Sequence, residues 1–122
     1  MALTDPVYIA RRKKVLDQIA AHPETHSQMV WENGCGTVRC VAGWAIHNEL
    51  PEGAPIRWIF DIKGYERAGY AIVAADLLGL GYYEAEELFR DANDDEAVNL
   101  LEQYVQRPAD VQHLPGYGES NE

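Results

Sequence analysis

The sequence predicts a mainly α-helical protein that folds as one compact domain of about five helices. Its 122 residues fall within the usual size of a single domain, and hydrophobic residues make up 47% of the chain, which is enough to form a core. Apolar residues recur at helical spacing in several stretches that begin or end at Pro or Gly. Only residues 56–62 are rich in β-branched and aromatic side chains, so we expect at most a minor β element there.

The first helix is expected over residues 5–21. Pro6 suits the first helical position, where a backbone N–H would have no partner, and Pro23 prevents the helix from continuing. The basic run at residues 11–14 is too short to indicate nucleic-acid binding. We interpret it as a solvated face that pairs with the acidic half of the molecule.

Residues 24–36 are expected to form a polar connection. It contains one helical turn near residues 27–31, in which Met29, Val30 and Trp31 anchor the connection to the core.

A second helix is expected directly after this connection. Gly36 provides a tight turn, and Thr37 is a favourable N-cap for a helix that continues to about Glu49 and stops at Pro51.

Three further helices are expected in the C-terminal half, over residues 66–78, 83–90 and 95–106. Glycines end the first of these helices, and Asn93 or Asp94 caps the last. The helical domain is therefore predicted to span residues 1–107, followed by a loosely ordered acidic tail at 108–122.

The stretch at residues 35–47, CGTVRCVAGWAIH, contains both cysteines of the chain. We interpret it as a structural packing seam, because a cysteine often behaves as a small buried hydrophobic residue. Gly43 would allow another helix to approach closely, and Trp44 would fill the core beside it. The seam consists of Cys35, Gly36, Thr37, Cys40, Gly43 and Trp44.

The alternative is a thiol or zinc site in the same stretch. A helix N-terminus lowers the pKa of a nearby cysteine, so either thiol would gain thiolate character. The spacing Cys-x4-Cys differs from that of zinc knuckles, and Cys40 and His47 lie about 10 Å apart along a helix. A zinc site would therefore need Cys35 and Cys40 together with His22 or His26. No catalytic set is recognisable, so the sequence favours a protein without cofactor that is not an enzyme.

The net charge of −10 is concentrated in the C-terminal part of the chain. Residues 1–75 contain eight acidic and eight basic residues, whereas residues 76–122 contain twelve acidic and two basic residues. Nucleic-acid binding is not expected from this part, because phosphate contacts need Lys and Arg. The charge serves either solubility or the binding of a partner protein. The predicted partner-binding face consists of Glu84, Glu86, Glu87, Asp91, Asp94 and Asp95.

Two other motifs in this half have simpler explanations. Residues 91–102 resemble a calcium-binding loop, but Glu96 replaces the glycine that such a loop needs, and an acid-rich helix cap explains the same residues. Residues 71–89 have the spacing of a helix-turn-helix unit, but the glutamates of the second helix would be repelled by phosphates.

The pattern Cys35-Gly-Thr-x-x-Cys40-x-Ala-Gly-Trp44-Ala resembles a family of short, largely uncharacterised proteins from actinobacteria and their bacteriophages. His22-Pro-Glu, Trp31, Ala75-x-Leu-Leu-Gly-Leu and Glu86-x-Leu-Phe89 fit the same family, so the resemblance covers roughly residues 15–102. It implies a compact helical domain of phage or prophage origin and brings no established activity.

Together these observations predict a small non-enzymatic accessory protein that binds a host or other partner protein through its acidic helices. A purely structural, self-associating component is the third hypothesis. The sequence has neither an apolar run of about 18 residues nor a basic and apolar leader, so we expect no membrane span and a cytoplasmic location in the bacterial host.

Overall fold

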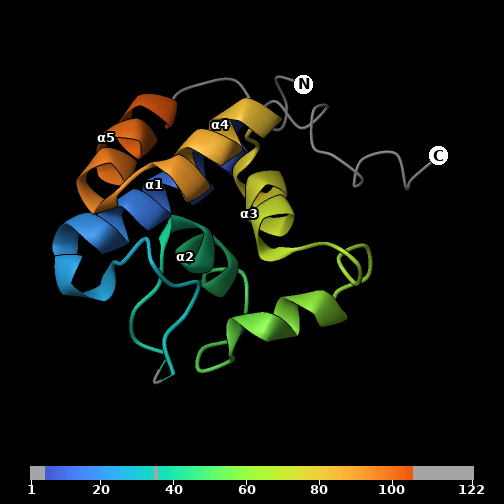
Figure 1. The fold of residues 1–122 in the computed structure, drawn as a ribbon. Helices are drawn as coiled ribbons and strands as arrows, with labels where there is room; N and C mark the ends of the chain where they lie inside the picture. The colour runs from blue at the N-terminus through green and yellow to red at the C-terminus, as the bar shows by residue number, and fades with distance from the viewer. Residues whose placement is uncertain (1–4, 35, 106–122) are drawn as a thin grey trace.

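The computed structural model describes residues 5–34 and 36–105, and this part of the chain is mainly α-helical, as predicted (Figure 1). It contains no strand, and none of its helices is both long and apolar enough to cross a membrane. The predicted tail at 108–122 lies outside the described residues. The elements are α1 (Asp5–Ala21), η2 (Pro23–Thr25), α2 (Val41–His47), η3 (Ile56–Asp61), α3 (Tyr70–Leu78), α4 (Tyr82–Glu86), the π-helical turn η4 (Glu87–Asp91) and α5 (Asp94–Tyr104).

The short helix α2 lies at the centre of the fold. All residues from Val41 to Ile46 are buried, and α2 packs against α1, α3, η3 and η4. Because it is covered on all sides, α2 needs no polar face, which explains its run of small and apolar residues.

The long helix α1 packs against both α3 and α5 and positions a buried arginine between them. Arg12 is fully buried, and its guanidinium donates hydrogen bonds to the carbonyl oxygens of Leu78, Gly79 and Tyr104 at 2.6 to 3.0 Å. These carbonyls lie at helix C-termini, which lack intrahelical partners and carry partial negative charge. The prediction of a fully solvated basic run is therefore wrong for Arg12, whereas Lys13 and Lys14 are exposed.

The predicted breaks in the C-terminal half are confirmed. Gly79 ends α3 in the left-handed conformation at φ 67°, and Asn93 caps α5 in a reciprocal pair of hydrogen bonds with Glu96. The start of the third predicted helix is wrong, because α3 begins at Tyr70 and residues 66–69 form a turn and loop.

The minor β element suggested for residues 56–62 is also not present. The segment forms the 3₁₀ helix η3, in which Ile56 and Ile59 are both buried. A 3₁₀ helix has three residues per turn, so these two side chains lie on the same face. Among the described residues, no extended segment lies beside residues 56–62 to pair with them as a strand. Burial of the two isoleucines therefore decides the conformation.

The connection before α2 forms no helix at residues 27–31, although Gln28 and Met29 make a turn in which the Val30 N–H donates to the Ser27 carbonyl at 3.5 Å. Its backbone pairs with the residues before α2: Ser27 N–H donates to the Arg39 carbonyl at 3.1 Å, and Cys40 N–H donates to the Val30 carbonyl at 2.8 Å. This pairing holds the segment at the surface. Met29 is 88% exposed and Trp31 is 40% exposed, so the prediction that both anchor the connection to the core is wrong.

Candidate functional site

Within the CGTVRCVAGWAIH stretch, the residues from Arg39 to Ile46 are buried at the start of α2, although the helix begins later than predicted. Cys40, rather than Thr37, is the N-cap, and its Sγ accepts a hydrogen bond from the Gly43 N–H at 3.4 Å. Thr37 is exposed and its N–H donates to the Asn33 side chain at 2.8 Å, so the Asn33 turn holds it away from the helix end.

Glycine is required at two positions of this seam. Gly36 has φ 72°, as expected for the predicted tight turn. Gly43 is required because a β-carbon there would collide with the backbone carbonyl of Trp31. The close approach expected at Gly43 is therefore made by the connection before α2 and not by another helix.

Trp44 fills the core as predicted. It is 7% exposed, and its indole N–H donates to the Thr25 carbonyl at 2.9 Å. The guanidinium of Arg39 lies over the indole ring, 4.6 Å from the ring centre. The seam thus joins α2 to the connection that precedes it.

The environment of Cys40 opposes thiolate chemistry. Burial raises the pKa of the Cys40 thiol, and this effect outweighs the backbone hydrogen bonds that lower it. The backbone N–H groups at the helix start lower the pKa of Cys40, as expected, but burial has the larger effect. Cys35 lies outside the described residues, so its role as a thiol or ligand stays a prediction.

The two histidines of the alternative zinc site differ in their surroundings. His22 is exposed and its Nδ1 lies 3.7 Å from a Glu24 carboxylate oxygen. His26 is buried, and its Nε2 lies 2.9 Å from the side-chain oxygen of Gln28. This oxygen also accepts from the Val41 N–H, which fixes the orientation of the Gln28 amide. With the Gln28 amide in this orientation, His26 Nε2 donates to the Gln28 oxygen, and the lone pair of the ring lies on Nδ1.

Within residues 5–34 and 36–105, no group of three His, Cys, Asp or Glu side chains is arranged to hold a metal ion. In particular, Asn93 and Glu96 of the calcium-like motif bind each other's backbone at the start of α5.

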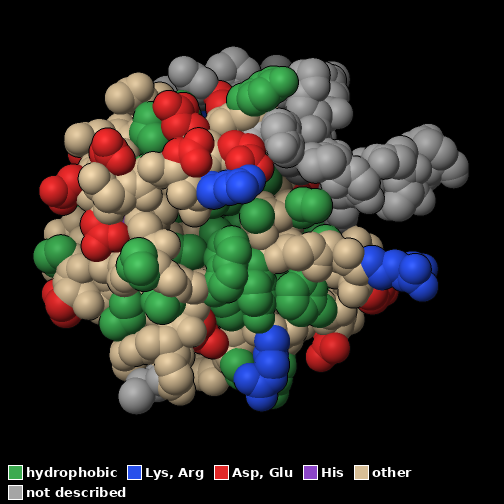
Figure 2. All heavy atoms as spheres, in the orientation of Figure 1, with side chains coloured by type: hydrophobic (Ala, Val, Ile, Leu, Met, Phe, Trp, Pro, Cys, Tyr) green, Lys and Arg blue, Asp and Glu red, His purple; other side chains and the backbone are tan. Residues whose placement is uncertain are grey.

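The predicted acidic face lies on α4, η4 and the beginning of α5 (Figure 2). Several of its carboxylates take part in hydrogen bonds or ion pairs within the chain. Glu86 pairs with Arg90 at 3.1 Å, Glu87 accepts from the Tyr104 hydroxyl at 2.7 Å, and Asp94 accepts from the Gln28 N–H at 2.7 Å. Glu84 accepts from the Gly81 N–H at 3.1 Å. Asp91 and Asp95 are exposed, and they are the members of this face best placed to meet a partner.

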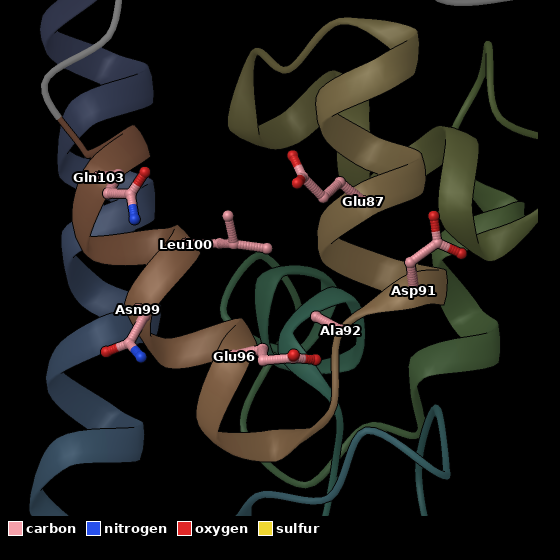
Figure 3. A pocket seen from close by; sticks show the side chains of 7 residues that line it. All are labelled: Glu87, Asp91, Ala92, Glu96, Asn99, Leu100 and Gln103. Atoms are coloured by element: carbon pink, nitrogen blue, oxygen red, sulfur yellow. The ribbon is translucent and has the colours of Figure 1, made fainter.

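An open groove of about 300 Å³ lies between η4 and α5 within this acidic surface. In Figure 3, the side chains of Glu87 and Leu100 point toward one another across the groove, and Glu96 lies at its lower end. We call it the acidic groove, lined by Glu87, Asp91, Ala92, Glu96, Asn99, Leu100 and Gln103. Its lining combines two apolar side chains, Ala92 and Leu100, with carboxylates, which suits the alkyl stem and charged end of Lys or Arg.

A π-helical turn forms one wall of the acidic groove. Single π turns are rare in proteins and occur frequently at functional sites. This turn, η4, carries Glu87 and Asp91 toward the surface, while Leu88 and Phe89 between them are buried. Sequence periodicity did not reveal the π turn, because the residues read equally well as an ordinary helix.

A second open groove, of about 400 Å³, lies where the connection before α2 meets η3 and α3. We call it the aromatic groove, and its lining residues are Met29, Val30, Trp31, Glu32, Ile56, Arg57 and Tyr70. The Trp31 and Tyr70 ring centres are 5.5 Å apart, and Phe60 stacks on Tyr70 at 4.9 Å. This groove is not visible in the sequence, which predicts that Met29 and Trp31 are buried.

The two charged side chains that line the aromatic groove, Glu32 and Arg57, differ in their pairing. Glu32 and Arg39 form a largely buried ion pair, with Glu32 Oε2 lying 2.8 Å and 2.9 Å from two guanidinium nitrogens of Arg39. Glu32 Oε1 accepts from the Ile56 N–H at 3.3 Å. Burial first, and then the charge of Glu32, raises the pKa of Tyr70, so this hydroxyl stays protonated. Arg57 is exposed, and no carboxylate of the described residues pairs with it.

Figure 2 shows a hydrophobic patch at the centre of the molecule, acidic side chains over α4 and α5, and basic side chains near η3. A small hollow of about 180 Å³ shares Met29, Val30 and Trp31 with the aromatic groove and extends to Phe89 of η4.

Comparison of the chain with known protein families, with curated proteins and with solved structures finds no match. The geometry and charge of the two grooves are therefore the observations that bear on function.

Proposed function

We propose that the chain is a small non-enzymatic accessory protein that binds a partner protein through the acidic surface of α4, η4 and α5. The observation that carries the proposal is the acidic groove, where carboxylates and the apolar side chains of Ala92 and Leu100 line a hollow beside a π turn. A surface that served solubility alone would need no such groove.

The local charge supports a basic partner. From Tyr82 to Val105 the chain contains eight acidic residues and one basic residue, Arg90, which is paired with Glu86. Such a surface attracts a basic protein at long range, and the attraction weakens as salt is added. It repels nucleic acid, so the proposed partner is a protein.

The resemblance to proteins of actinobacteria and their bacteriophages extends the proposal. An accessory protein of a phage would act in the cytoplasm of its host and bind a host protein. No specific observation favours the thiol-dependent or zinc-dependent alternative, since the Cys40 thiol is buried and its pKa is raised.

Affinity capture from an actinobacterial lysate tests the proposal when it is combined with a charge-matched pair of variants. The test variant carries Asp91→Lys and Asp95→Lys, which change exposed residues of the acidic surface. The control variant carries Asp17→Lys and Glu52→Lys, which change the net charge equally at exposed sites elsewhere.

We expect the wild-type chain and the control to retain the same partner at moderate salt, and the test variant to lose most of it. Equal loss from both variants would mean that only net charge matters, and equal retention would mean that the partner binds elsewhere. Recovery of no partner at low or moderate salt would contradict the proposal.

A further inference from the structure

The aromatic groove presents the residue types that dominate the energetics of protein interfaces. Trp, Tyr and Arg are the residues whose loss most often costs binding energy, and the groove carries Trp31, Tyr70 and Arg57 together. Met29, which is 88% exposed, adds a flexible apolar side chain at the edge. Contiguous exposed apolar surface of this kind usually marks an interaction site.

The groove is also held rigidly in place. The Cys40 N–H binds the Val30 carbonyl at 2.8 Å, and the Trp31 backbone lies directly against Gly43. The Trp31 ring is further supported by Tyr70. A surface that is already ordered loses little conformational entropy when a partner binds.

The charged residues of the groove indicate which kind of partner segment it binds. Glu32 is neutralised by Arg39, and its second oxygen is taken by the Ile56 N–H. Arg57 is therefore the exposed charge of the groove, and it complements a carboxylate. The remaining walls are apolar or aromatic.

We infer that the aromatic groove receives a segment of the partner protein that places an aromatic or branched aliphatic side chain against Trp31 and Tyr70 and a carboxylate beside Arg57. This inference rests on the proposed function and specifies the partner further. A small hollow extends from the groove to Phe89 of η4.

The test uses the full chain to select binders from a library of displayed random peptides. A selected peptide is then synthesised, and its affinity for each variant is measured by fluorescence anisotropy. We expect the enriched peptides to share an apolar anchor with a nearby Asp or Glu. Trp31→Ala and Arg57→Glu should each weaken binding by about tenfold or more, as for interface residues of these types.

Matched control variants outside the groove show whether the loss of peptide binding is specific to the groove. Trp58 is 49% exposed and Lys63 is exposed, and neither lines the groove, so Trp58→Ala and Lys63→Glu should bind like the wild type. Met29→Glu changes a side chain that is almost fully exposed and therefore tests the groove without disturbing the fold.

Several results would overturn the inference: no enriched peptide, enriched peptides that lack a carboxylate, or binding that is insensitive to the Trp31, Met29 and Arg57 variants. Concentration-dependent self-association that Met29→Glu abolishes would assign the groove to a second copy instead. If the groove variants still capture the lysate partner fully while Asp91→Lys with Asp95→Lys does not, the inference fails and the proposed function stands. If only the groove variants lose it, the partner binds at the aromatic groove, and the acidic surface is not its binding site.

Discussion

The carbonyl oxygen of Trp31 occupies the position that a β-carbon on Gly43 would take. The Arg39 side chain closes the same space from another direction, with its Cβ 2.9 Å from that position. Because the clash involves backbone, a rotamer change cannot relieve it. The seam at the start of α2 and the wall of the aromatic groove are therefore one structural unit.

Gly43→Ala is expected to destabilise the fold by about 2 to 3 kcal/mol, because the connection must move away from α2. The loss of stability is measured by urea unfolding, with circular dichroism as the signal. Gly34→Ala is the matched control, since a β-carbon there meets no atom within 4 Å, and it should change stability by less than about 0.5 kcal/mol. Equal stability of the two variants would disprove the close contact.

The buried guanidinium of Arg12 makes a second prediction. Arg12→Met keeps the apolar stem but leaves carbonyls at the C-termini of α3 and α5 without their donor. Leaving buried partners unsatisfied should cost about 3 kcal/mol or more. Lys13→Met, at the exposed neighbouring position, should leave the urea midpoint nearly unchanged. Similar midpoints for the two variants would contradict the role of Arg12 in joining the helices.

Sequence reasoning identified most helices because their boundaries depend on local chemistry. The bounds of α1, the left-handed Gly79 and the Asn93 cap are each determined by a few neighbouring residues. The start of α2 was missed because residues distant from Thr37 decide it. Backbone pairing with the connection keeps Arg39 extended, so the helix begins only after Cys40.

The candidate site was only partly predictable for the same reason. The acidic residues of α4 and α5 are visible in the sequence, and their surface follows from helical spacing. The aromatic groove is not visible, because Trp31 and Tyr70 are 39 positions apart and meet only in the folded chain. Exposure of Met29 and burial of Arg12 both oppose the usual preference of those residue types.

The raised pKa of Cys40 gives a prediction about pH and reactivity. An ordinary thiol has a pKa of about 8.5, so above this value the unfolded chain loses a proton that folded Cys40 retains. Stability from this group is therefore present below pH 8.5 or so and falls as the pH rises toward the folded pKa.

A pair of variants isolates this effect. Cys35→Ser alone is compared with Cys35→Ser plus Cys40→Ala by urea unfolding from neutral pH to about pH 9.5. The variant that retains Cys40 should lose more stability with pH, and Cys40 should react with iodoacetamide slowly unless the chain is unfolded. Rapid alkylation in the native state would revive the thiol-dependent alternative.

The ion pair between Glu32 and Arg39 gives the last prediction, since it supports both Trp44 and the aromatic groove. The side chains of Arg39 and Glu32 are 5% and 14% exposed, so Glu32→Gln leaves a largely buried cation without its anion. Removing one partner of such a pair should lower the free energy of unfolding by about 3 kcal/mol or more. The double variant Glu32→Gln with Arg39→Met should lose less stability than the sum of the two single variants.

The comparison for this pair is Glu49, which lies 3.5 Å from Arg11 with both side chains about 30% exposed. An exposed pair contributes at most about 1 kcal/mol, so Glu49→Gln should be nearly neutral. If Glu32→Gln were as mild as Glu49→Gln in urea unfolding, the charge of Glu32 would not be held by Arg39. It would then be available to the aromatic groove, and a carboxylate-bearing partner segment would be repelled rather than bound.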